Sequence, residues 1–219
     1  MGYLKINFKN KRGIYVILDL KTFKTKDLNK LDQILSDQIL AVQLWDNLKN
    51  YEAHYGIIDK IVGIVQQHGI PILMNNRVDM AEKFDFDGVH LDDIPSDWIS
   101  IKEQLSGKVV GITCTNDTEV LRWAEQHKVD YVSFCSMFPS VNNTRCELVD
   151  RRMIARFQET MRIPFFLAGG ITPENIAGLS SIFYQGVALV ADLMAHANPK
   201  EVIKHYYDKM NLNDENKNY

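Results

Sequence analysis

The chain has 219 residues, of which 46% are apolar, and its formal net charge is -3 at neutral pH. That length and apolar content suit a single domain over residues 1–210, and the slight negative charge excludes nucleic acid and anionic membranes as partners. No stretch reaches the roughly 18 apolar residues of a membrane span, and the three cysteines follow no zinc or disulfide spacing, so we expect a reduced, cytoplasmic protein.

Eight short apolar runs alternate with amphipathic stretches, and this alternation is typical of βαβ units around a parallel sheet. Because each run is followed by a helical pattern, the sequence favours an α/β fold of the (β/α)8 TIM barrel type over an open doubly wound sheet. The predicted strands are Ile14–Leu18, Ala41–Leu44, Ile70–Met74, Gly88–Leu91, Val109–Thr113, Tyr131–Phe134, Phe165–Ala168 and Gly186–Val190.

The segments between the runs carry helical signals. In Tyr51–Gln67 the apolar side chains fall on one stripe. The stretch Asn116-Asp117-Thr118-Glu119 predicts a capped helix start, and Thr172-Pro173 predicts another because proline suits the first helical turn. The polar residues 211–219 have no apolar face and are expected to form a flexible tail.

In a barrel the loops after the strands build the site, so residues just past each strand end are the candidates. The third strand is followed by Asn75, Asn76 and Arg77, whose two amides and guanidinium suit the recognition of planar polar groups. A polar loop that caps the next helix is the alternative. At this point the residues alone leave both interpretations open.

The fourth strand ends with His90 and continues into Asp92 and Asp93, which places an imidazole beside two carboxylates. Adjacent carboxylates can hold Mg²⁺ next to substrate phosphates, although either aspartate could instead cap a turn. Thr113 at the end of the fifth strand offers a hydroxyl that could donate to phosphate oxygens or cap the next helix.

The last three strands end in loops that suit a phosphate. After the sixth strand, the polar stretch from Phe138 to Arg145 suits a loop that covers a ligand. Gly169-Gly170 follows the seventh strand directly, where paired glycines allow close approach of the backbone and a following helix terminus favours an anion. Val190-Ala191 after the eighth strand would form the second wall of this phosphate site. A tight turn without a ligand is the alternative.

Taken in chain order, several stretches together resemble the family of thiamine phosphate synthases and thiazole tautomerases, from Ile14 to about Met210. The stretches that carry the resemblance are Ile14–Asp19, Val42–Leu44, Asn75–Ala81, Asp87–Leu91, Asp130–Val132, Phe138–Ser140 and Ala168–Asn175. The resemblance implies an enzyme of thiamine biosynthesis that couples a hydroxymethylpyrimidine diphosphate to a thiazole phosphate. Pyrophosphate leaves in that reaction, and in the family Mg²⁺ and cationic side chains stabilise its negative charge.

The same resemblance implies roles for individual residues. The implied substrate- and phosphate-binding residues are Gln43, Asn75, Asn76, Arg77, Ser140, Thr144, Arg145, Gly169, Gly170, Val190 and Ala191, the catalytic candidates are His90, Thr113 and Cys135, and Asp93 and Asp92 are the candidates for Mg²⁺. The chain also departs from the family pattern. It reads Trp45-Asp46-Asn47 where synthases carry two cations after the second strand, and Asn76 stands at the position of a magnesium-binding aspartate. These departures imply an impaired or altered synthase.

Two alternatives stay open. The first is an isomerase like the thiazole phosphate tautomerases, in which His90 or Cys135 would move the proton. The second is a non-catalytic barrel that binds a thiamine precursor. Members of the family often pair, and Trp98, Phe183 and Tyr184 are candidates for a homodimer interface.

Overall fold

The computed structural model describes residues 8, 11–139, 147–190 and 192–215. Within these residues, eight parallel strands pair in chain order and close into a barrel, because β8 also pairs with β1. The predicted fold class is therefore confirmed. The strands are β1 (Gly13–Asp19), β2 (Ile39–Trp45), β3 (Ile72–Asn75), β4 (Gly88–Leu91), β5 (Val109–Cys114), β6 (Tyr131–Cys135), β7 (Phe165–Ala168) and β8 (Gly186–Leu189).

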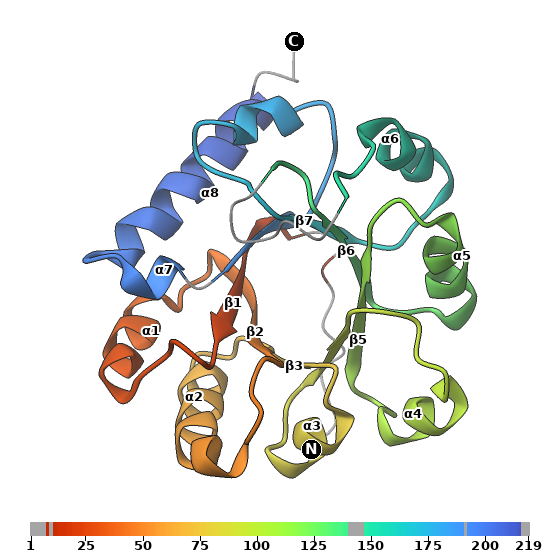
Figure 1. Ribbon diagram of the computed structural model, residues 1–219. Coiled ribbons are helices and arrows are strands. Elements are labelled where there is room, and N and C mark those ends of the chain that lie inside the picture. Colours follow the sequence, from red (N-terminus) through yellow and green to blue (C-terminus); the bar gives the residue numbers. More distant parts are fainter. Residues whose placement is uncertain (1–7, 9–10, 140–146, 191, 216–219) are drawn as a thin grey trace.

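Helices surround the strands as an outer ring (Figure 1). The α-helices are α1 (Leu28–Ile34), α2 (Tyr55–Gln67), α3 (Val78–Lys83), α4 (Trp98–Gln104), α5 (Thr118–His127), α6 (Arg151–Thr160), α7 (Asp192–Ala195) and α8 (Pro199–Glu215), and the 3-10 helices are η1 (Thr25–Asp27), η2 (Glu52–His54) and η3 (Ile176–Leu179). The predicted cap before α5 is confirmed, and Asp117 forms it, because its side chain accepts a hydrogen bond from the amide of Glu119. No described helix has both the length and the apolar character that crossing a membrane requires.

Alternation along the strands divides the apolar side chains into two clusters. Val16 belongs to the larger cluster, which packs between strands and helices, whereas its neighbour Tyr15 points into the barrel. The interior cluster also contains Phe8, Tyr131 and Phe166. The ring of Phe8 lies 5.5 Å from that of Tyr131 and 5.3 Å from that of Phe166, both edge to face. The barrel interior is thus a packed core, which leaves the rim as the place for chemistry.

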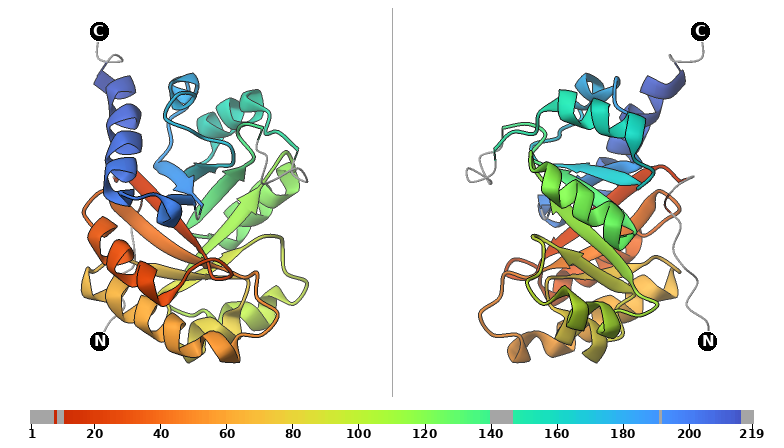
Figure 2. Two further views of the ribbon diagram at one scale, coloured as in Figure 1. Left: turned by 60° about the vertical axis from the view of Figure 1, so that its left-hand side comes forward. Right: turned by 90° about the vertical axis from the view of Figure 1, so that its right-hand side faces the viewer.

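Helix α8 covers the place where the first and last strands meet. It lies against α1 and β1 (Figure 2). From α1, the ammonium of Lys30 donates to the carbonyls of Met194 and His196 over 2.8 and 2.9 Å. These contacts attach the segment before α8 to the first helix and hold the outer ring closed.

Several predicted boundaries need correction. The third strand begins at Ile72 instead of Ile70, and the eighth ends at Leu189. Thr172-Pro173 does not begin an α-helix, because the chain makes a turn there and continues into the short η3. Helix α8 runs to Glu215, so residues 211–215, which were expected in the tail, are helical, and residues 216–219 lie outside the described part.

Candidate functional site

The site is built at the rim where the parallel strands end. Because the strands are parallel and the barrel is closed, their carboxyl ends meet on one face. This arrangement brings residues from distant parts of the chain to one mouth. The strand ends there include Asn75, His90, Thr113, Cys135 and Ala168.

A chain of buried hydrogen bonds crosses the barrel just below this rim. The hydroxyl of Tyr15 donates to Oε1 of Gln43 over 2.8 Å and lies 2.8 Å from the hydroxyl of Tyr131. Tyr131 in turn lies 2.9 Å from Nδ1 of His90, and Nε2 of His90 lies 2.8 Å from Oγ1 of Thr113. The five side chains come from β2, β1, β6, β4 and β5, so only closure of the barrel brings them together.

The hydrogens of this chain can be assigned by following it from Gln43. Tyr15 donates its one hydroxyl hydrogen to Gln43, so in the contact between the two tyrosines Tyr131 donates and the oxygen of Tyr15 accepts. The Tyr131 oxygen then accepts from Nδ1–H of His90, which leaves Nε2 to accept from the hydroxyl of Thr113. Burial lowers the pKa of His90 to about 4, so the ring is neutral at neutral pH as this pattern requires.

This assignment corrects the expectation for Thr113. The sequence left this hydroxyl to donate either to phosphate or to a helix end, but its hydrogen is engaged by His90, so its oxygen can only accept a hydrogen bond from a ligand. Gln43 is 4% exposed, and no hydrogen bond between described residues uses its amide hydrogens. The mouth therefore presents an acceptor at Thr113 and a donor at Gln43. Both tyrosines were missed at the sequence level, although a tyrosine in an apolar strand needs a partner for its hydroxyl and so indicates a buried polar group.

A second cluster joins the ends of β3 and β4. One oxygen of Asp92 accepts from Nδ2 of Asn75 over 2.9 Å and the other from Nδ2 of Asn76 over 2.8 Å. The amide of Asp92 donates to Oδ1 of Asn76 over 2.9 Å. Asp93 is exposed, and no hydrogen bond between described residues joins it to this cluster.

The resemblance implies Mg²⁺ at this position, and the residues present do not fit it. Mg²⁺ requires oxygen ligands in near-octahedral geometry. Here Asn76 offers its NH₂ to Asp92, and no group of three or more His, Cys, Asp or Glu residues in the described part of the chain could hold a metal ion. The expectation that Asp93 leads the metal site finds no support in this geometry, because Asp92 is the carboxylate that faces β3.

Arg77 is engaged beside the rim. Its guanidinium makes two hydrogen bonds to the carboxylate of Asp79, over 2.8 and 2.6 Å, and stacks 4.7 Å from the ring centre of Tyr51. The bonds from Arg77 lower the pKa of Asp79. The hydroxyl of Tyr51 donates to Asp46, which follows β2 in the stretch where this chain lacks the two cations that the family resemblance implies. The charge of Arg77 is therefore largely balanced by its neighbours.

The Gly169-Gly170 turn lies at the carboxyl end of β7, on the same rim as Asn75 and His90. Both glycines have positive φ, 84° and 67°. A Cβ at Gly169 would meet Oγ of Ser136 at 2.5 Å, so the close approach here is to the chain after β6. The amide of Gly169 takes part in the pairing of β7 with β8, whereas no hydrogen bond between described residues takes the amide hydrogens of Gly170 or Ile171, which leaves two consecutive donors at the turn.

Other predicted residues have different positions. Val190 is 47% exposed just after β8, and Cys135 packs partly buried against the interior cluster. Ser140, Thr144, Arg145 and Ala191 lie outside the described residues, as does most of the loop that was expected to cover a ligand.

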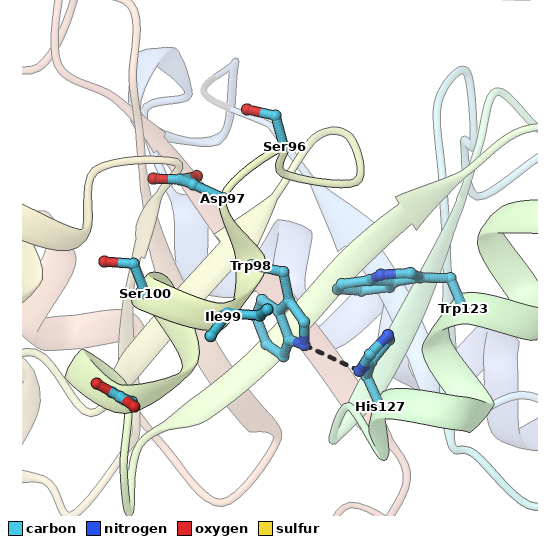
Figure 3. Close-up of a pocket in the computed structure, with 8 residues that line it drawn as sticks. Ser96, Asp97, Trp98, Ile99, Ser100, Trp123 and His127 are labelled. Carbon is cyan, nitrogen blue, oxygen red and sulfur yellow. Dashed lines mark hydrogen bonds between the residues drawn. The ribbon is translucent and has the colours of Figure 1, made fainter.

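A pocket in the helical layer is separate from the mouth. Figure 3 shows Trp98 of α4 beside Trp123 and His127 of α5, with Nε1 of Trp98 donating to Nδ1 of His127 over 2.9 Å. None of the predicted catalytic, substrate or metal residues lines this pocket. Of the interface candidates, Phe183 is 61% exposed, whereas Tyr184 is 1% exposed and cannot contribute to an interface.

Comparisons with known proteins cover most of the chain. Residues 14–193 match the family model described as thiamine monophosphate synthase. A thiamine-phosphate synthase from Alkaliphilus oremlandii is 28% identical, over 90% of this chain and 95% of its own, and one from Methanobrevibacter smithii is 26% identical, over 86% and 90%. A solved structure of a thiamine phosphate pyrophosphorylase from Pyrococcus furiosus has the same fold, with a TM-score of 0.79 at 21% identity over 94% of this chain and 99% of that one.

Proposed function

The chain belongs to the thiamine monophosphate synthase family, and from this premise we propose that it couples a hydroxymethylpyrimidine diphosphate to a thiazole phosphate and releases pyrophosphate. The observation that carries the proposal is the Gly169-Gly170 turn, where the donor amides of Gly170 and Ile171 lie at the mouth of a barrel that matches this family over residues 14–193. Backbone amides at such a turn suit a phosphate, and we assign this position to the thiazole phosphate.

The pyrimidine would lie over the buried hydrogen-bond chain. An aminopyrimidine offers an amine donor and ring nitrogen acceptors, which match the acceptor at Thr113 and the donor at Gln43. Neutral His90 would act as a positioning residue, since it holds the Thr113 hydrogen away from the ligand. In the reaction, the carbon–oxygen bond to pyrophosphate breaks with its electron pair leaving on oxygen, and the thiazole nitrogen lone pair forms the new carbon–nitrogen bond.

Departing pyrophosphate needs positive partners. Among the candidates, Arg77 shares its charge with Asp79, so we assign the positive charge to Arg145 and additional hydrogen-bond donors to Ser140 and Thr144, all after β6, on the strength of the family resemblance. Asn75, Asn76, Val190 and Ala191 would complete the wall of the mouth. We place this activity in the cytoplasm, where a biosynthetic enzyme meets small phosphorylated precursors.

The test is release of pyrophosphate from purified protein given both precursors, measured with Mg²⁺ and with a chelator. The proposal expects thiamine phosphate and pyrophosphate in equal amounts. Thr113→Val removes the acceptor and should lower kcat/KM by about 10-fold or more, chiefly through the KM of the pyrimidine substrate. Thr118→Val, an exposed threonine at the start of α5, is the matched control and should leave both constants unchanged. Binding of thiazole phosphate without any turnover in either condition would contradict the proposal.

A further inference from the structure

The orientation of both asparagines at the end of β3 is determined by backbone amides. A backbone N–H can only donate, and the amides of Asp46 and Asp92 donate to Oδ1 of Asn75 and Oδ1 of Asn76, over 3.1 and 2.9 Å. Each carboxamide must therefore turn its NH₂ toward the Asp92 carboxylate. Nδ2 of Asn75 also donates to the carbonyl of His90 over 3.1 Å, which holds this fully buried side chain a second time.

Asn76 thus places its amide hydrogens beside Asp92, in the space that a cation would occupy if position 76 also carried a carboxylate. Its Nδ2 lies 2.8 Å from Asp92, and rotating the amide to present oxygen there would break the bond from the Asp92 backbone. A cation on this side of Asp92 would meet the positive ends of two amide groups. An aspartate at position 76 would instead bring two like charges together, an arrangement that needs a cation or a proton between them.

We infer that Asn76 replaces a divalent cation at this rim, so that Asp92 is held in place by amides and the mouth keeps its geometry without metal. The inference goes beyond the proposed function, because it concerns the protein without substrate. It also gives Asp92 a structural role, which is to accept the amide hydrogens of Asn75 and Asn76 at the mouth.

Position 76 is well suited to a test. Asn76 has a φ of 56°, in the left-handed region that asparagine and aspartate both tolerate. Asn76→Asp therefore exchanges NH₂ for oxygen with little change in backbone preference. Asn29→Asp adds the same charge at an exposed site in α1 and serves as the matched control.

The readout is metal binding to the protein alone, with Mn²⁺ followed by electron paramagnetic resonance and Mg²⁺ by calorimetry. The wild-type protein and Asn29→Asp should bind no more tightly than about 1 mM, whereas Asn76→Asp should bind at least about 10-fold more tightly. The melting temperature should rise with Mg²⁺ only in Asn76→Asp. An Asn76→Asp protein that folds only when Mg²⁺ is present would equally support the inference.

Two results would overturn it. One is wild-type binding of Mn²⁺ tighter than about 0.1 mM that is lost in Asp92→Asn. The other is a folded Asn76→Asp that binds metal no better than Asn29→Asp. If Asn76→Asp does not fold in either condition, the wild-type titration decides the question. Failure of the proposed function would be seen separately, as the absence of pyrophosphate release.

Discussion

His90 is neutral in the folded protein because it is buried among barrel side chains and both of its ring nitrogens are engaged. Tyr131 and Thr113 occupy the two nitrogens, and the Tyr131 ring lies nearly parallel to the imidazole at 5.5 Å. Burial lowers the pKa of His90 to about 4, and the negative charge of Asp92 opposes this shift only in part. A proton on His90 would have to displace the hydrogen from Thr113.

This pKa predicts a pH dependence of stability. The pKa of His90 is about 4 in the folded protein against its ordinary value of 6.5, so the unfolded chain takes up the proton first as pH falls. The stabilisation by neutral His90 is complete above pH 6.5 and is lost toward pH 4, and the loss is on the order of 3 kcal/mol. Urea unfolding across this range should show a steeper loss for the wild-type protein than for His90→Gln. Equal pH dependence in the two proteins would contradict the assignment of a neutral, buried imidazole.

At the scale of elements, the turn between β7 and η3 replaces the α-helix start expected at Thr172-Pro173. Asn175 explains the difference, because its side chain bonds in both directions. Its Nδ2 donates to the carbonyl of Gly170 over 2.8 Å, and its Oδ1 accepts from the amide of Thr172 over 2.8 Å. A turn closed in this way satisfies backbone groups without a helix, and the donors at the mouth come from the turn itself.

Gly169→Ala should destabilise this turn strongly. Its φ of 84° is costly for a residue with a side chain, and the new Cβ would lie 2.5 Å from Ser136 Oγ. We expect a loss of about 2 kcal/mol or more in the free energy of unfolding. In Gly178→Ala, where the nearest atom is 3.7 Å away, stability should change by no more than about 0.5 kcal/mol. Unfolding in urea measures both, and equal effects would show that the turn is not tightly packed.

At the scale of the whole molecule, closure depends on how closely β8 approaches β1. Gly13 pairs with Gly186, and a Cβ at Gly186 would meet the carbonyl oxygen of Gly13 at 2.0 Å. Only a residue without a side chain allows the first and last strands to pair here. Since the hydrogen-bond chain takes residues from β1 and β6, the site depends on this closure as well.

Gly186→Ala should therefore weaken the whole barrel. We expect a loss of about 3 kcal/mol or more, with a lower urea midpoint. Gly63→Ala is the control, because it lies in α2 with open space around the new Cβ, and it should gain about 0.5–1 kcal/mol. A wild-type midpoint in Gly186→Ala would show that the strands can separate at this point without cost.

Local patterns were enough to determine the architecture and the family of this protein. The apolar runs predicted the strands to within a few residues, since burial on both faces of a parallel strand leaves a continuous apolar signal. The position of Gly169-Gly170 after the seventh run identified a turn at the mouth, and the order of matching stretches indicated the family. These features depend on residues close together in the chain.

The state of the site was decided only by tertiary structure. Tyr15 and Tyr131 are 116 positions apart, and neither indicates by itself which way its hydroxyl hydrogen points. Arg77 is present in the sequence as a cation, but folding stacks it on the ring of Tyr51, which is distant in the chain. From the sequence, Asn76 is a candidate for substrate binding and Asp92 a candidate for metal binding. Only the folded structure shows that the backbone amide of Asp92 sets the orientation of Asn76. Which group donates a hydrogen and which accepts it depends on the contacts that each makes, and contacts between strands form only once the barrel has closed.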